Sequence, residues 1–240
     1  MTVRQMFERM LINIRKEESP HLQLHEFNMY VNDAVHNFVT SVLIPFETTQ
    51  KTADYLREIK TTGIVTSADL TPSLKGGVKF TLPPNYRDMK SVIYTIKVNG
   101  AIIDKCYKIG DSLQFHVHKS DSDKYSSTVI DAMQRPRYFR PYYFIQGAEC
   151  EVVYGNISNI SVEQIMFDYI KYPVIVELTY QQAFEDNADT SQLIEFSDAA
   201  CIEITKELVK LIMERSSDQR VQTHPTVNAP SQKPEIMPRQ

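Results

Sequence analysis

The N-terminal part of the chain carries apolar residues at the three- and four-residue spacing of amphipathic helices. Thr2 and Gln5 have the spacing of a capping box, in which each side chain satisfies a backbone donor at the start of a helix. The pattern predicts a first helix that starts there and stops before Pro20, a second from about Leu22 to Leu43, and a weaker one around Ala53–Ile59.

From Ile64 the pattern changes to the alternation of apolar and polar residues that is typical of β-strands. Asn99-Gly100 is a hairpin turn signal, because both residues tolerate positive φ. A short helix is expected over Ser126–Gln134. The predicted strands are Val78–Leu82, Val92–Val98, a return strand Ile102–Cys106, Leu113–Val117, Cys150–Tyr154 and Val174–Leu178. Antiparallel strands between helical ends predict an α+β fold.

A capped amphipathic helix is predicted after Ser197, whose hydroxyl can accept a bond from an unpaired N–H of the first turn. Its apolar residues form two neighbouring rows: Cys201, Ile204, Leu208 and Leu211, then Ile202, Val209 and Met213. A stripe this wide fits a helix that packs on its own domain and on a second surface. An ordinary core helix has the same periodicity.

The last part of the chain loses its periodicity, and HPTVNAPSQKPEIMPRQ contains four prolines. Such a segment buries too little apolar surface to offset its ordering entropy, so we expect an extended arm that a neighbouring subunit holds. The contacts expected from it are Pro225, Val227, Pro230, Pro234 and Ile236. The chain is thus divided into N-terminal helices (1–62), a β-rich region (63–188), the C-terminal helix (189–217) and the arm (218–240).

The composition is typical of a water-soluble protein whose cysteines are reduced thiols, and it argues against a glycine-rich nucleotide-binding loop. The 240 residues are 42% hydrophobic with a net charge of −4, and 7 glycines are few for a phosphate-binding loop. The cysteines Cys106, Cys150 and Cys201 have neither disulfide nor zinc spacing. No secretory signal and no run of about 18 apolar residues is present, so we expect synthesis in the cytoplasm and no membrane partner.

No motif of an enzyme or cofactor site was recognised, and we expect no catalytic residue, metal or cofactor. Two histidine pairs have ligand-like spacing without a third ligand: His21 with His25, and His116 with His118. An acidic run at Glu185, Asp186 and Asp189 is interpreted as a solvated loop; the alternative is a hydrolase that needs a divalent ion.

Residues 135–143 interleave arginine with aromatic residues. Arginine and tyrosine are typical anchors of protein interfaces, which is our preferred interpretation, because the chain is acidic overall and has no wider basic patch. The alternative is a single-stranded nucleic-acid-binding module in which aromatic rings stack on bases. The expected contact residues are Arg137, Tyr138, Arg140, Tyr142 and Tyr143.

Three stretches resemble the ring (head–tail adaptor) proteins of crAss-like bacteriophages: FETTQKTADYL at 46–56, RPRYFRPYY at 135–143, and DTSQLIEFSDAACIEITKELVKLIMERSSDQRVQ at 189–222. Phe139 stands where the first arginine of the family's Arg-Arg-Pro-Tyr-Tyr run is expected. Ser197-Asp198 replaces the usual Pro-Asp before the helix, which changes the cap and keeps the register.

The resemblance implies a structural virion protein and no enzyme. Such proteins form twelve-fold rings below the portal, in the neck and upper tail, and contact the portal and other ring and tail proteins. It implies assembly in the host cytoplasm and a place in the virion neck, where genomic DNA passes through the bore without specific binding. A net negative bore would let DNA slide.

Overall fold

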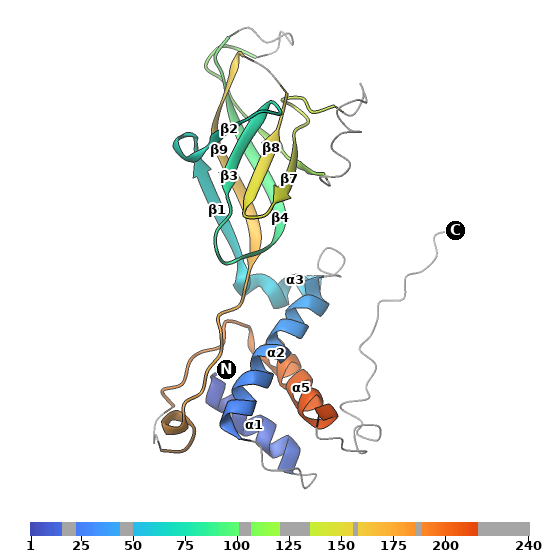
Figure 1. The fold of residues 1–240 in the computed structure, drawn as a ribbon, viewed down its shortest axis with the longest axis vertical. Coiled ribbons are helices and arrows are strands. Elements are labelled where there is room, and N and C mark those ends of the chain that lie inside the picture. The colour runs from blue at the N-terminus through green and yellow to red at the C-terminus, as the bar shows by residue number, and fades with distance from the viewer. Residues whose placement is uncertain are drawn as a thin grey trace, which may run out of the picture. The chain divides into compact units, whose positions relative to one another are not determined.

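A computed structural model describes residues 1–15, 23–43, 50–100, 107–120, 135–155, 158–185 and 189–215. The chain forms two compact units (Figure 1): a helical unit of residues 1–59 and 173–240, and a β unit of residues 60–172. The sequence-based division placed the boundaries of the β-rich region at 62/63 and 188/189, so it included residues 173–188, which belong to the helical unit. Helices at both ends and antiparallel sheets in the middle confirm the predicted α+β fold.

The helical unit contains α1 (Val3–Arg15), α2 (Leu24–Leu43), α3 (Gln50–Leu56) with a 3₁₀ turn (Arg57–Ile59), and α5 (Asp198–Arg215). The predicted capping box at α1 is confirmed, since Thr2 and Gln5 each donate a backbone N–H to the other's side chain at 3.2 Å. The predicted cap of α5 is confirmed too, because the Ser197 hydroxyl accepts the N–H of Ala200 at 3.3 Å. Local sequence therefore sets where both helices begin.

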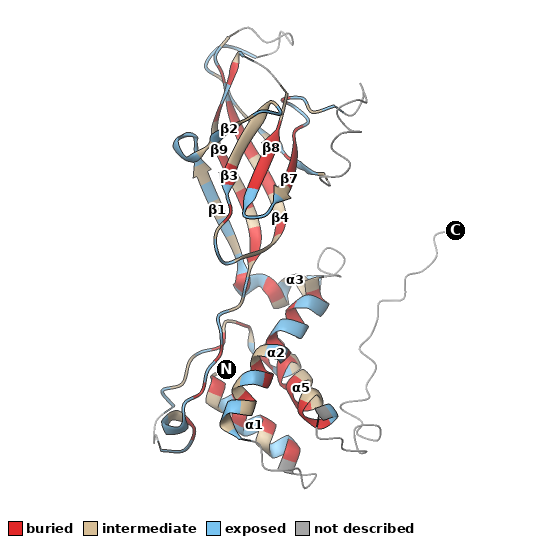
Figure 2. Cartoon of the chain, viewed as in Figure 1, coloured by how far each residue is buried: buried red, intermediate tan, exposed pale blue. Residues whose placement is uncertain are grey.

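Helix α5 packs against α1 and α2, and Figure 2 shows buried stripes along these helices. Both predicted rows of α5 enter this core: Cys201, Ile204 and Leu208 are fully buried, and Val209 and Met213 nearly so. Ile202, 43% exposed, is the clear exception. The width of the stripe is explained by two helical neighbours in the same unit.

The β unit is a sandwich of two sheets. One has the strand order β1 (Lys60–Thr66), β9 (Ile160–Lys171), β4 (Tyr86–Val98), β5 (Ser112–His116). The other has the order β2 (Thr71–Ser73), β3 (Gly77–Thr81), β8 (Glu149–Val153), β7 (Tyr142–Gln146), β6 (His118–Lys119). All pairs are antiparallel except the two-residue pair of β6 with β7.

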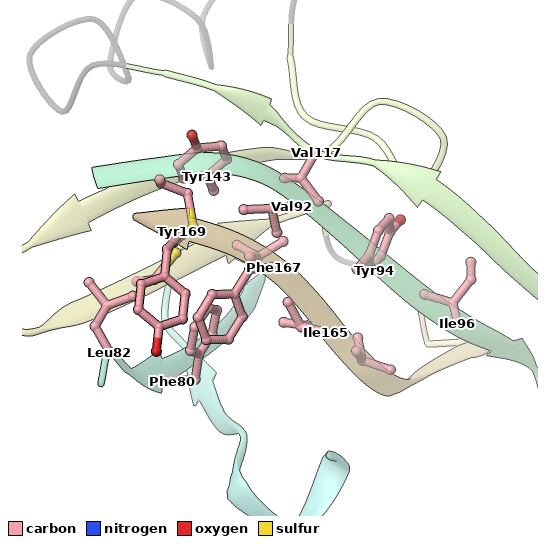
Figure 3. Close-up of a cluster of buried hydrophobic side chains, with 14 of the residues drawn as sticks. Phe80, Leu82, Val92, Tyr94, Ile96, Val117, Tyr143, Ile165, Phe167 and Tyr169 are labelled. Carbon is pink, nitrogen blue, oxygen red and sulfur yellow. The ribbon is translucent and has the colours of Figure 1, made fainter. Parts of the chain in front are cut away.

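The core of the β unit lies between the two sheets (Figure 3). Phe80 from one sheet packs on Phe167 from the other with ring centroids 5.1 Å apart. Tyr94 is fully buried and stacks on Tyr154 at 5.7 Å. Aromatic pairs of this kind contribute about 1 kcal/mol each beyond the area that they bury.

The predicted strands at 78–82, 92–98, 113–117 and 150–154 correspond to β3, β4, β5 and β8. The long strand β9 was missed, because its alternation shifts phase. Thr95 pairs with Gln164 and Ile96 with Val162, so Glu163 is the extra residue of a β-bulge. The predicted return strand at 102–106 and short helix at 126–134 lie outside the described residues.

Candidate protein interface

The exposed part of the aromatic-basic cluster is a tight turn, Arg135–Arg140, which we call the arginine turn. The N–H of Arg137 donates to the carbonyl of Arg140 at 3.2 Å, and the N–H of Arg140 donates back at 2.9 Å. The buried hydroxyl of Tyr94 donates to the carbonyl of Tyr138 and ties the turn to β4. The turn therefore has a fixed shape before any partner binds.

The tyrosines of the cluster are core residues of the chain itself. Tyr138, Tyr142 and Tyr143 are only 6%, 8% and 4% exposed. The ring of Tyr138 packs edge-on against Phe115 at 6.0 Å. Strand β7 starts at Tyr142 and lies between β8 and β6, and its first three residues, 142–144, are buried. The prediction that these three tyrosines anchor a contact with a partner is therefore corrected. Their rings are buried and have little surface area to offer.

Arg137 and Arg140 are exposed as predicted, and Phe139 is 46% exposed between them. The guanidinium of Arg137 lies 5.7 Å from the Phe139 ring. Among the aromatic residues of 135–143, only Phe139 is exposed. The cluster therefore offers one ring for base stacking, whereas the nucleic-acid interpretation expected several. The other predicted contacts, Pro225, Val227, Pro230, Pro234 and Ile236, lie outside the described residues.

A second surface lies on the connecting segment, by which we mean residues 173–197 between β9 and α5. The strand predicted at 174–178 is wrong, since no strand among the described residues pairs with this stretch. Two asparagines of α2 take the place of a partner strand. The Asn32 amide donates to the carbonyl of Val176 and accepts its N–H, both at 2.8 Å. Asn28 makes the same pair of bonds to Leu178, at 3.0 and 2.9 Å.

The asparagine pairs turn Val176 and Leu178 toward the helices, where both side chains are buried. The residues between and around them therefore face water. Five large apolar side chains of the segment are at least 50% exposed: Val174, Ile175, Tyr180, Phe184 and Leu193. Tyr180 and Phe184 contact each other with centroids 5.0 Å apart, and Phe184 also packs edge-on against Phe7 of α1 at 6.0 Å.

The charge of the connecting segment is of one sign. Glu177, Glu185, Asp186, Asp189 and Glu195 are its acidic residues, and its sequence contains no lysine, arginine or histidine. Glu177, Glu185 and Asp189 are exposed. Sequence reasoning interpreted the acidic run as a solvated loop and missed this surface. The sequence did contain an indication of this surface. Aromatic residues stand among the acidic residues of 173–197, and no basic residue lies between them.

The far end of the segment is held by the N-terminus. The N–H of Val3 donates to the carbonyl of Gln192 at 3.0 Å, and Thr2 forms a β-bridge with Leu193. The hydroxyls of Ser191 and Thr2 donate to the Asp189 carboxylate and lower its pKa. The segment is thus fixed at Asn28 and Asn32 on one side and at α1 on the other.

Chemistry for catalysis is sparse in the described part of the chain. No three histidine, cysteine or acidic residues there are grouped so as to hold a metal ion. Burial, with a smaller contribution from the Glu151 charge, raises the pKa of the Cys150 thiol to about 12, and burial also raises that of Cys201. These thiols are therefore poor nucleophiles at neutral pH.

An open recess of about 370 Å³ is lined by Glu58, Leu193, Ile194, Glu195, Phe196 and Ser197.

Among the helices that the structure describes, none combines the length and apolar character needed to cross a membrane. Comparison of the chain with protein-family models and with curated protein sequences gives no match.

Proposed function

We propose that the chain is a structural subunit of an oligomeric ring in the portal–tail channel of a bacteriophage virion. In this role it stacks on the portal or on other ring and tail proteins, and genomic DNA passes through the bore without specific binding. The sequence resemblance of residues 46–56, 135–143 and 189–222 to ring proteins supports the proposal.

The observation that carries an assembly role is the apolar surface of the connecting segment. Five large apolar side chains within 20 residues leave half or more of their area in water: Val174, Ile175, Tyr180, Phe184 and Leu193. Covering apolar area stabilises a complex by roughly 25 cal/mol per Å² before the costs of association. Tyr180 and Phe184 contact each other within this stretch, and exposed apolar side chains that lie together are typical of a protein contact. A ring subunit needs such surfaces, because it contacts a neighbour on each side.

Negative-stain images and sedimentation velocity of the purified chain test the proposal, together with immunogold labelling of virions that carry its gene. We expect rings, or concentration-dependent oligomers, and label at the neck of the particle. A chain that stays monomeric at high concentration and is missing from the particles would overturn the proposal.

Deleting residues 218–240 is a second test. We expect the truncated chain to keep the circular dichroism and unfolding transition of the full chain, because the buried core residues of the described ranges all precede residue 216. We also expect it to fail to join its ring or a neighbouring ring, since an arm that reaches a neighbour adds affinity through effective concentration. Normal ring formation and normal virion assembly by the truncated chain would contradict the role of the arm.

A further inference from the structure

We propose that the arginine turn of one copy docks on the connecting segment of a second copy, so that copies join head to tail. The inference rests on the proposed ring function and names the two surfaces that form its repeated contact. The turn belongs to the β unit and the segment to the helical unit, so each copy carries one of each.

The arginine turn has the features of an interface anchor residue cluster: a fixed backbone, arginines and an exposed aromatic ring. Its backbone is closed by the two hydrogen bonds between Arg137 and Arg140, and its base is held by the buried Tyr138. Phe139 stands against Tyr138 with ring centroids 5.2 Å apart and keeps 46% of its area exposed. Arginine and aromatic residues dominate interface anchors. A preformed turn also loses less conformational entropy on binding than a flexible loop does.

The connecting segment offers the complementary chemistry. Tyr180 and Phe184, 63% and 56% exposed, form an aromatic pair that a phenylalanine ring can pack on. Glu177 and Glu185 flank this pair in the chain, and both are exposed. The stretch 135–148 has three arginines and no acidic residue, whereas 173–197 has five acidic residues and no basic one. Opposite potentials of this kind steer two surfaces together and fix their register.

The charges also disfavour contacts between two like surfaces. Two arginine turns repel each other, and so do two connecting segments, because each carries charge of one sign. In a head-to-tail contact between unlike surfaces, each copy uses its turn toward one neighbour and keeps its segment for another. When such a contact repeats head to tail, it generates closed rings or open filaments.

Reciprocal charge reversal tests the contact in the full-length chain. One variant carries Arg137→Glu and Arg140→Glu, and the other carries Glu177→Arg and Glu185→Arg. By sedimentation velocity we expect each variant alone to lose oligomers, with association at least about 30-fold weaker, as for loss of an interface anchor. In an equimolar mixture, every junction again joins opposite charges at the substituted positions, so we expect oligomers to return.

Two further variants separate this contact from general effects. Lys97→Glu with Lys108→Glu changes net charge by the same amount at exposed sites outside the turn, and oligomers should persist. Phe139→Ala leaves charge unchanged and should weaken association, which keeps the test valid if a reversed variant misfolds. Oligomers that persist in both reversed variants and in Phe139→Ala overturn the inference and leave the ring function standing. Reversed variants that lose oligomers but do not recover on mixing also overturn it. A wild-type chain without self-association overturns both.

Discussion

Replacing Asn32 by alanine tests whether side-chain amides of α2 hold the connecting segment in place. The change removes two hydrogen bonds of 2.8 Å to the backbone of Val176. At a net value of about 1 kcal/mol each, their loss costs about 2 kcal/mol. Alanine recovers about 0.5 kcal/mol of helix propensity. We therefore expect the helical unit to lose about 1.5 kcal/mol of its free energy of unfolding.

Asn37→Ala is the matched control, because Asn37 lies exposed on the same helix and the propensity change is the same. It should leave stability unchanged or slightly raised. Urea unfolding followed by far-ultraviolet circular dichroism measures the difference. Hydrogen exchange gives a local readout: the Val176 amide should exchange about tenfold faster in Asn32→Ala, the factor that corresponds to about 1.4 kcal/mol. Equal stability of the two variants, with unchanged exchange at Val176, would refute the reasoning.

Three further changes test other parts of the structure. Gly77→Ala places a Cβ 2.0 Å from the Val152 carbonyl oxygen, so urea unfolding of the β unit should show a loss of about 3 kcal/mol; wild-type stability would contradict this packing. Cys150 should resist iodoacetamide at pH about 8 until the protein unfolds, as followed by mass spectrometry, since burial raises its pKa to about 12; rapid labelling of the folded protein would disprove the burial. The Ser191 and Thr2 hydroxyls lower the pKa of Asp189, so its stabilisation is present above the unfolded value of 3.8 and is lost as the pH falls below it. The thermal stability advantage of wild type over Asp189→Asn should therefore shrink from about pH 5 to about pH 3, and a constant difference would refute the linkage.

Signals within a few residues of one another were sufficient to predict the α-helices that the structure describes. The capping box at Thr2 and Gln5, the cap at Ser197 and the apolar rows of α5 each depend on neighbours three or four positions apart. The same holds for strands with regular alternation, such as β4. A helix or a regular strand repeats one local geometry, so its pattern is visible in one dimension.

The candidate surfaces were decided by contacts between distant parts of the chain. The Tyr138 ring is buried because β4 and β5 lie over it, and nothing in RPRYFRPYY alone separates it from the exposed Phe139. The stretch at 174–178 has the alternation of a strand, yet its hydrogen-bond partners are Asn28 and Asn32, about 150 positions away. The sequence by itself determined which residues are apolar and how they repeat. Tertiary structure decided which of them are covered, because burial depends on what packs against a residue and not on its neighbours along the chain.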